Sequence, residues 1–337
     1  MARRAVFILG MHRSGTSLLT SLLHVAGVQL GSDLLLGAAP ENNRGFWEHR
    51  EVVRINEELL ARLGLSWSAP SPLPAGRAAD PRLNALADHA AELVRREFTG
   101  VALWGIKDPR LCRLQPFWER AAAGVADEVH AVHVFRHPLE VADSLHARNG
   151  MPPEQSLLLW LFHNLEAVLH PRQLPLVSIP VRSILEAPSA TIAHVLAALG
   201  AGGDLPPAVA QAIGQLVEPA LLHHRAQPGD PRLDTPAGAL AGRCHDCLER
   251  QAAGTDVVAE LEEIRSQLLA LVETRRRSIA ARACRTADVI VPVYAGFEST
   301  MRCIDAVLQG GGDFDLLVIN DASPDVTITQ QIGRAHV

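Results

Sequence analysis

Eight residues near the N-terminus have the types and spacing of a loop that binds an oxyanion. The run Gly10-Met-His-Arg-Ser-Gly-Thr-Ser17 follows the apolar segment 5–9 directly and opens a stretch of leucines with helical spacing. Its glycines have the spacing of GxxxxGK[ST], a loop whose backbone amides and following helix N-terminus hold a phosphate. Thr16 occupies the lysine position of that pattern, and a positive charge stands earlier, at Arg13. The loop therefore predicts phosphate binding and disfavours an ATP or GTP hydrolase.

A second group of residues could also bind a phosphate. Residues 128–135 alternate as in a strand, Arg136 follows them, and a helix is expected from about 139 to 148. Ser144 and Arg148 are four residues apart and therefore share one face of that helix. An arginine with a hydroxyl suits a phosphate dianion. A solvated amphipathic helix would explain the same residues, but together with the first loop they indicate a second phosphate contact.

Lys107 is the only lysine in a chain with 31 lysine and arginine residues. A compact ammonium and a planar guanidinium are not interchangeable, so this position is a candidate for a role that arginine cannot fill. The lysine stands in Trp104-Gly-Ile-Lys-Asp-Pro-Arg110, at the end of a strand expected at 101–106. Asp108 is expected to orient the lysine or cap a turn rather than act as a base.

Taken together, these segments resemble the sulfotransferases that use 3′-phosphoadenosine 5′-phosphosulfate (PAPS), and especially the bacterial ones. The first loop resembles their 5′-phosphosulfate loop, and the segment from Arg136 to Ser144 resembles their 3′-phosphate motif. The Lys107 segment resembles the KDP element of bacterial members and of the tyrosyl-protein branch. The resemblance covers roughly residues 5–225.

The resemblance implies a P-loop-type parallel sheet flanked by helices, and a role for each residue. Arg13 and Lys107 would neutralise the charge that grows on the bridging and leaving oxygens, so that no metal is required. The implied PAPS-binding residues are Arg13, Ser14, Gly15, Thr16, Ser17, Arg136, Ser144 and Arg148.

An acceptor hydroxyl also needs a base. The run Pro40-Glu-Asn-Asn-Arg-Gly-Phe-Trp-Glu48-His-Arg-Glu51 resembles a segment that follows the loop in bacterial members. Glu48 is the expected base, and His12 and His49 are the alternatives. Glu48 could equally cap the helix that follows.

The expected elements alternate between strands and helices, which indicates an α/β sheet. In chain order they are a strand at 5–9, a helix from Thr16 to about Gly27, helices at 51–63 and 83–98, strands at 101–106 and 128–135, a helix at 139–148, and mainly helix after Ser156.

We expect four parts along the chain: a sulfotransferase domain at 1–230, a linker with a long helix at 231–287, an incomplete Rossmann-like β-α-β fragment at 288–331, and a non-native tail at 332–337. The boundary is placed in the Pro-, Gly- and Ala-rich stretch 228–242. The last six residues can be encoded by a sequencing adapter, which is why we interpret them as non-native.

The C-terminal fragment resembles the start of family 2 glycosyltransferases. Val291-Pro-Val-Tyr294 matches the first strand and Asn320-Asp-Ala-Ser-Pro-Asp325 the nucleotide-binding turn. By that resemblance Asp321 would contact the base of a sugar nucleotide. The association suggests that the sulfotransferase acceptor is a glycan or glycolipid.

Composition restricts the alternatives. A net charge of -6 and a pI near 6.2 argue against a nucleic-acid partner, which would require a basic surface. Five cysteines, an odd and small number, fit the cytoplasm better than a disulfide framework. No run approaches the ~18 apolar residues of a membrane helix. The remaining alternatives are a P-loop nucleotide-dependent kinase and a non-catalytic module that binds a phosphoryl ligand.

Overall fold

The computed structural model describes residues 2–35, 45–74, 80–169, 174–217, 227, 229–283, 287–293, 297–309 and 314–320. The chain divides into two compact units, Met1–Leu269 and Ala270–Val337. None of the helices within the described ranges is long and apolar enough to cross a membrane.

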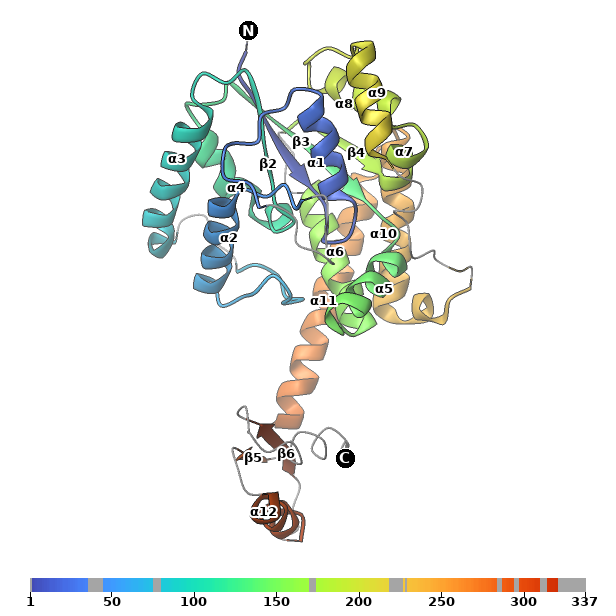
Figure 1. Cartoon of the computed structure of the whole chain (residues 1–337). Helices are drawn as coiled ribbons and strands as arrows, with labels where there is room; N and C mark the ends of the chain where they lie inside the picture. The colour runs from blue at the N-terminus through green and yellow to red at the C-terminus, as the bar shows by residue number, and fades with distance from the viewer. Residues whose placement is uncertain are drawn as a thin grey trace. The chain divides into compact units, whose positions relative to one another are not determined.

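Four parallel strands form the centre of the first unit (Figure 1). They are, in sheet order, β2 (Leu103–Lys107), β1 (Arg4–Leu9), β3 (Glu128–Phe135) and β4 (Leu176–Pro180). The chain passes from β1 to β2 on one side and then crosses to β3 on the other. Ligands of open α/β sheets bind outside the carboxyl ends of the strands at such a switch point. The predicted α/β class is therefore confirmed, with a sheet order that places a crevice beside the end of β1.

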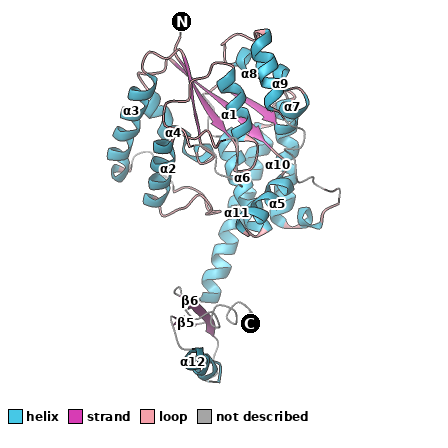
Figure 2. Ribbon diagram, in the orientation of Figure 1, coloured by secondary structure: helices cyan, strands magenta, loops and turns pink. Residues whose placement is uncertain are grey.

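Helices cover both faces of this sheet (Figure 2). β1 is a continuous apolar run because alternate residues serve two cores, as in strands covered on both faces. Phe7 belongs to the core beneath three helices: α2 (Arg50–Arg62), α3 (Asn84–Phe98) and α4 (Leu111–Ala122). Ile8 belongs to the core on the opposite face, which is formed with α1 (Thr16–Val25), α7 (Val181–Glu186), α8 (Pro188–Ala198) and α9 (Pro207–Leu216).

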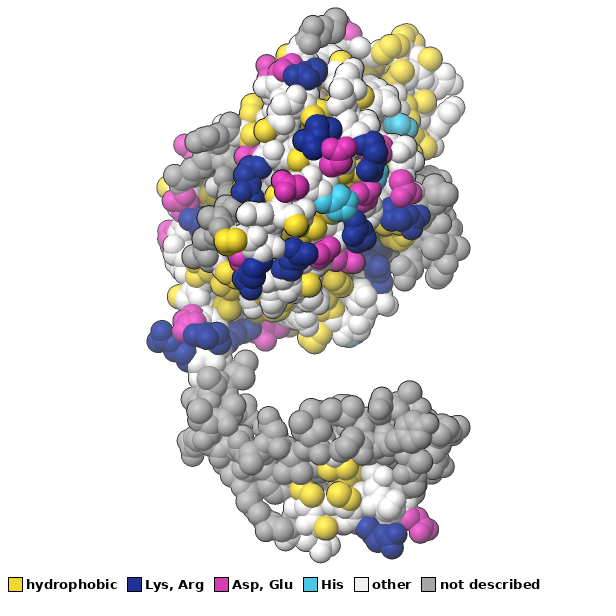
Figure 3. Space-filling view, turned by 90° about the vertical axis from the view of Figure 1, so that its left-hand side faces the viewer, with side chains coloured by type: hydrophobic (Ala, Val, Ile, Leu, Met, Phe, Trp, Pro, Cys, Tyr) yellow, Lys and Arg dark blue, Asp and Glu magenta, His cyan; other side chains and the backbone are white. Residues whose placement is uncertain are grey.

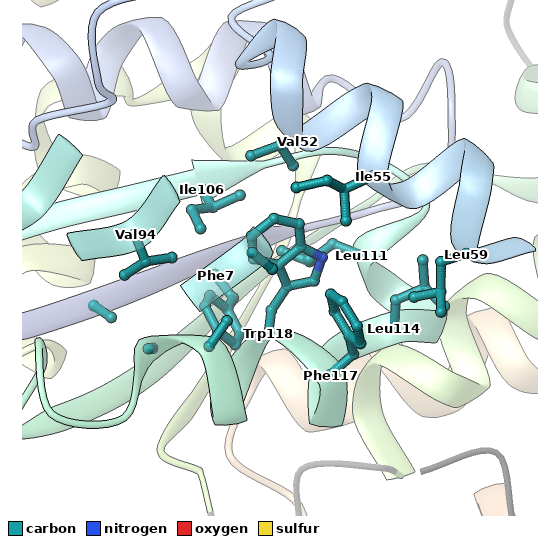
Figure 4. Close-up of a cluster of buried hydrophobic side chains, with 14 of the residues drawn as sticks. Phe7, Val52, Ile55, Leu59, Val94, Ile106, Leu111, Leu114, Phe117 and Trp118 are labelled. Atoms are coloured by element: carbon teal, nitrogen blue, oxygen red, sulfur yellow. The ribbon is translucent and has the colours of Figure 1, made fainter. Parts of the chain in front are cut away.

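Trp118 lies at the centre of the first of these cores (Figure 4). Its ring meets Phe117 edge to face, with centroids 5.7 Å apart. Its indole Nε1 donates to Asn56 Oδ1 at 2.7 Å, which satisfies the one polar atom of a fully buried tryptophan. This contact ties α2 to α4, the helix that follows the strand ending at Lys107.

A second helical layer contains α5 (Pro138–Asn149), α6 (Pro153–Leu169), α10 (Pro236–Ala252) and α11 (Val258–Ala283). α6 packs against both α5 and α10 and is buried along nearly its whole length. A helix that is apolar on all sides needs such surroundings. α5 begins with Pro138 in its first turn, as predicted, and ends at Gly150 in the left-handed region.

The structure differs from the predicted elements at two places in this unit. β4 and α4 were not predicted: β4 is a five-residue edge strand, and α4 contains Pro116, which masks its helical pattern. The other predicted elements of this unit are present within a few residues of their expected bounds.

The predicted boundary near residue 230 also differs from the division of the structure, since residues 231–269 belong to the first unit. α10 buries Cys244 and Cys247, and Arg250 Nη2 of this helix lies 2.6 Å from Glu260 Oε2 of α11. The long helix that the sequence predicts in the linker is packed against this unit at its start, where Val257 just before α11 and Leu261, Ile264 and Leu268 within it are buried. Its apolar spacing therefore reflects packing within the domain rather than a free spacer.

In the second unit, β5 (Ala287–Val293) and β6 (Phe314–Asn320) pair in parallel, with α12 (Phe297–Gln309) between them in the chain. This confirms the predicted β-α-β fragment. Asp321 and the tail 332–337 lie outside the described residues, and the glycosyltransferase resemblance stays a prediction.

Candidate functional site

Three of the predicted segments meet at one edge of the sheet. Lys107 is the last residue of β2 and pairs with Ile8 of β1. Along the strand direction, Lys107 therefore lies two residues before Gly10. Arg136 follows the last residue of β3, the strand on the other side of β1. Because parallel strands end at the same edge, the register alone brings the phosphate loop, Lys107 and Arg136 to one crevice.

The loop between β1 and α1 has the conformation of an anion cradle. Gly15 is the N-cap of α1 at φ 92° and, being a glycine, makes no side-chain cap to the amides of the first helical turn. A Cβ at Gly10 would lie 2.5 Å from Val134 O, so the loop can pass close to β3 only with glycine there. Arg13 has φ 69°, a conformation that costs about 1–3 kcal/mol for a non-glycine residue and is typical of binding sites.

The same loop fits a phosphate in its polar groups. Within the described residues, the buried Ser14 Oγ has no hydrogen-bond partner. An oxyanion bound at the N-terminus of α1 would satisfy both this hydroxyl and the first-turn amides of Thr16 and Ser17. The residues present therefore suit the 5′-phosphosulfate group that the sequence predicts.

Lys107 is 3% exposed and joins two walls of the crevice. Its Nζ donates to Glu48 Oε1 at 2.6 Å and to Phe46 O at 2.8 Å on one wall. On the other wall it reaches Ser17 Oγ, at the start of α1, at 3.3 Å. An ammonium has three protons to donate, and here three oxygen atoms accept from it. A planar guanidinium would not make this set of contacts.

Glu48 lies on a short segment that is held in place by its backbone. Leu35 N donates to Glu48 O at 2.7 Å, and Phe46 N donates to Leu35 O at 3.2 Å. Trp47, between them, has φ 59°. Burial raises the pKa of the Glu48 carboxyl, and the Lys107 ammonium opposes that rise. The part of the predicted segment from Pro40 to Arg44 lies outside the described residues.

The two histidine alternatives for the base differ in their surroundings. His49 is the N-cap of α2: its Nδ1 accepts from Glu51 N at 3.3 Å, and its Nε2 lies 3.8 Å from Glu97 Oε1. The cap predicted for Glu48 therefore falls on His49, which faces α3. The ring of His12 packs against that of Trp67 at a tilt of 56°, with centroids 4.7 Å apart. Burial, followed by the charge of Arg110, lowers the pKa of His12 well below the usual value.

The residues predicted for the 3′-phosphate lie beside the first loop. Arg13 Nε donates to Ser144 Oγ at 2.8 Å, and Arg136 Nη1 donates to Arg13 O at 3.4 Å. Ser144 is 5% and Arg136 8% exposed, and Arg136 Nε is held by Glu140 Oε2 at 2.8 Å. Arg148 is exposed one helical turn beyond Ser144 on α5. The two predicted phosphate segments thus form one continuous set of arginine and hydroxyl groups.

Asp108 does not serve as a base in this arrangement. Its buried carboxylate accepts from Arg110 N at 2.8 Å and from Arg110 Nη1 at 3.1 Å, which closes the turn that leads into α4. This agrees with the second of its two predicted roles, the cap of a turn.

Three neighbours of the loop were missed from the sequence. Cys112 Sγ receives the Gly10 amide at 3.1 Å, Trp67 covers one side of His12, and His163 lies with its ring centroid 6.2 Å from that of His12. Cys112 lies two residues after the segment Trp104–Arg110, a position that could have suggested it. Trp67 and His163 carry no sequence signal, because their loop and helix reach the crevice only through tertiary packing.

The surface away from the crevice carries both signs of charge. On the face in Figure 3, basic and acidic side chains lie intermixed. The pairs on α3 are of this kind, for example Arg95 Nη2 with Glu92 Oε2 at 2.7 Å. Groups of three or more metal-ligating side chains are absent from the described residues.

No protein-family model matches the chain, and no curated protein does. Among solved structures, the sulfotransferase domain of the Synechococcus PCC 7002 olefin synthase is 18% identical with a TM-score of 0.43, and the match covers 72% of this chain and 94% of that one. A sulfotransferase domain from the curacin biosynthetic pathway is 15% identical with a TM-score of 0.39, covering 61% and 76%. The sulfotransferase STF1 of Mycobacterium tuberculosis H37Rv is 12% identical with a TM-score of 0.35, covering 76% and 78%.

Proposed function

We propose that the chain is a sulfotransferase that moves a sulfuryl group from PAPS to an acceptor hydroxyl. The observation that supports this most strongly is the position of Lys107. A single buried ammonium bridges the start of the phosphate-loop helix, at Ser17, and an acidic segment, at Glu48. A phosphate loop without its usual lysine, supplied with a cation from the neighbouring strand, suits a group transfer in which charge grows on a leaving phosphate oxygen.

The donor nucleotide would be held at both of its phosphate ends. The amides and hydroxyls of Ser14 to Ser17 would receive the 5′-phosphosulfate at the N-terminus of α1. Arg136, Ser144 and Arg148 would receive the 3′-phosphate, a dianion that suits a set of arginine and hydroxyl donors. Arg13 lies between these two groups, since its guanidinium donates to Ser144 while its backbone belongs to the loop.

In the transfer, the acceptor oxygen forms a bond to sulfur while the bond from sulfur to the 5′-phosphate oxygen breaks, and the electron pair leaves with that phosphate. Lys107 and Arg13 would stabilise the negative charge on the departing oxygen. The acceptor proton would pass to Glu48, whose buried carboxyl has a raised pKa and is therefore closer to the range of an effective base at neutral pH.

For the acceptor we propose a hydroxyl on a carbohydrate. The support is that the same chain carries a segment, residues 288–331, whose sequence resembles the start of family 2 glycosyltransferases. The crevice adds an aromatic ring, Trp67, beside the phosphate loop. Indole rings offer a large apolar face with a polar tip, which suits the mixed surface of a sugar.

The direct test is transfer of radiolabelled sulfate from PAPS to a panel of glycans and glycolipids by the full chain. We expect at least one labelled product that Lys107→Met does not form. The matched control is Arg3→Met, which removes a cation paired with Asp127 at 2.6 Å, remote from the crevice. Labelled product formed equally by the wild type and Lys107→Met would contradict the proposal.

A further inference from the structure

α5, the helix that carries Ser144, is held by an ion pair between its Asp143 and Arg232, which lies 89 residues later in the chain. Arg232 lies in a short 3-10 helix, Pro231–Asp234. Its Nη1 and Nη2 donate to the two carboxylate oxygens of Asp143, the second at 3.3 Å. Its Nε and Nη2 also donate to Asp230, at 3.0 and 2.6 Å. This fork between two carboxylates is the geometry for which a guanidinium is suited.

Asp143 directly precedes Ser144 in α5, so the ion pair of Asp143 with Arg232 also affects the orientation of Ser144. Neighbouring helical residues project about 100° apart, because a turn holds about 3.6 residues. The Asp143 side chain is 32% exposed and turns outward, whereas Ser144 is 5% exposed and accepts from Arg13 Nε at 2.8 Å. Arg232 holds α5 at Asp143, and Arg13 holds it at Ser144 on a different side. Together, these two contacts fix the rotation of α5 about its own axis.

The turn that carries Arg232 is itself fixed on α10. Thr235, the N-cap of α10, donates its hydroxyl to Arg232 O at 2.8 Å and accepts from Gly238 N at 3.0 Å. A Cβ at Gly238 would lie 1.9 Å from Arg232 O, so the turn can sit on the helix only because that residue is glycine. α10 in turn packs against α6. Arg232 is therefore anchored to the body of the domain.

We propose that Arg232 is a positioning residue of the donor site, which holds α5 so that Ser144 meets Arg13 and the 3′-phosphate. The inference rests on the proposed function. Two carboxylates already occupy its guanidinium, so Arg232 acts through Asp143 rather than as a ligand of the nucleotide. The segment after residue 230, taken from the sequence as a linker, thereby becomes part of the nucleotide site.

The test uses binding alone and needs no acceptor. Calorimetric titration gives the ratio of affinities for adenosine 3′,5′-bisphosphate over adenosine 5′-monophosphate, which measures the contribution of the 3′-phosphate. We expect Arg232→Gln to lower this ratio about fivefold, the scale of losing a partly exposed ion pair. Asp143→Asn, which removes the same ion pair from the α5 side and leaves the pair with Asp230 in place, should lower the ratio by a similar factor. Arg250→Gln, which breaks a pair between α10 and α11, is the matched control and should keep the wild-type ratio.

The possible outcomes separate the inference from the function on which it rests. Equal affinity losses for both nucleotides in Arg232→Gln, or an unchanged ratio in Asp143→Asn, would overturn the positioning role while leaving the donor site intact. A wild-type ratio near one would overturn the 3′-phosphate site and the inference with it. Should Arg232→Gln fail to fold, Arg232→Lys keeps the charge without the planar guanidinium; an intermediate ratio supports the proposal, and an unchanged ratio overturns it.

Discussion

Lys107 Nζ lies 2.6 Å from Glu48 Oε1, and this pair joins two segments that are 59 residues apart in the chain. The lysine side chain is 2% exposed and the glutamate 12%. Each charge is removed from water and depends on the other. Loss of one partner from such a pair leaves an uncompensated buried charge, whereas loss of both is tolerated far better.

The first prediction concerns the stability of this pair. We expect Lys107→Met to lower the free energy of unfolding by about 3–5 kcal/mol, because Glu48 is left buried without its cation. Lys107→Met combined with Glu48→Gln should recover a large part of that loss. Urea denaturation of the single and double variants is the measurement, and equal stability of the two would show that the residues do not depend on each other.

The second prediction concerns the nucleotide selectivity that Arg136 provides. We expect Arg136→Ala to weaken binding of adenosine 3′,5′-bisphosphate about tenfold or more, the scale of a charge-assisted hydrogen bond to phosphate. Binding of adenosine 5′-phosphosulfate, which has no 3′-phosphate, should change far less. Calorimetric titration with both nucleotides measures the difference. Equal losses would refute the assignment of Arg136 to the 3′-phosphate.

The third prediction concerns the backbone of the phosphate loop. Gly15 has φ 92°, and a Cβ there would lie 2.6 Å from Val181 Cγ2. We expect Gly15→Ala to cost about 1–3 kcal/mol of stability and to weaken nucleotide binding. Gly214→Ala is the matched control: Gly214 lies in α9 with open space around its Cβ position, so the same change should be neutral or stabilising. Thermal unfolding of both variants gives the comparison, and a stable, fully binding Gly15→Ala would mean that the loop does not need its left-handed turn.

The fourth prediction concerns acid stability. His163 is fully buried, its Nδ1 donates to Leu159 O at 2.8 Å, and burial lowers its pKa to about 3. In the unfolded chain the pKa of a histidine is about 6.5, so below that pH the unfolded state binds the proton and the folded state does not. Stability is therefore retained above pH 6.5 and lost as the pH falls toward 3.

Between pH 7 and pH 5 this histidine should account for about 2 kcal/mol of lost stability. We expect His163→Gln to flatten the pH dependence by that amount, whatever its effect on stability at pH 7. The same substitution at exposed His194 in α8 is the control for the exchange itself. Urea denaturation at several pH values is the measurement, and an unchanged slope in His163→Gln would contradict the role of the buried imidazole.

Local patterns in the sequence carried much of the fold. The apolar run of β1, the alternation of β3 and Pro138 at the start of α5 each specify an element through residues close together in the chain. β4 was missed because a short edge strand has too few residues for a pattern. The predicted boundary near residue 230 differs from the extent of the first unit because apolar residues three and four apart, such as Leu261, Ile264 and Leu268, look the same on a spacer helix as on a helix packed within the domain.

For the site, the sequence predicted those residues that belong to motifs with a recognisable local spacing, but not the contacts between the motifs. Arg13 and Ser144 are 131 residues apart, and their contact follows from strand order, which no local pattern contains. The helix cap that was the alternative role for Glu48 is made by His49, one residue later, and Glu48 contacts Lys107 instead. Arg232 was missed because its partner, Asp143, is brought to it only by the packing of α10 on α6.

The most direct test of the account is a thermal-shift titration with adenosine 3′,5′-bisphosphate, the desulfated product of PAPS, compared with ATP with and without magnesium. The account predicts stabilisation by the bisphosphate that is indifferent to magnesium, reaching about 2.7 kcal/mol at 100 times the dissociation constant. Stabilisation only by ATP with magnesium would contradict the sulfotransferase reading and point to a kinase.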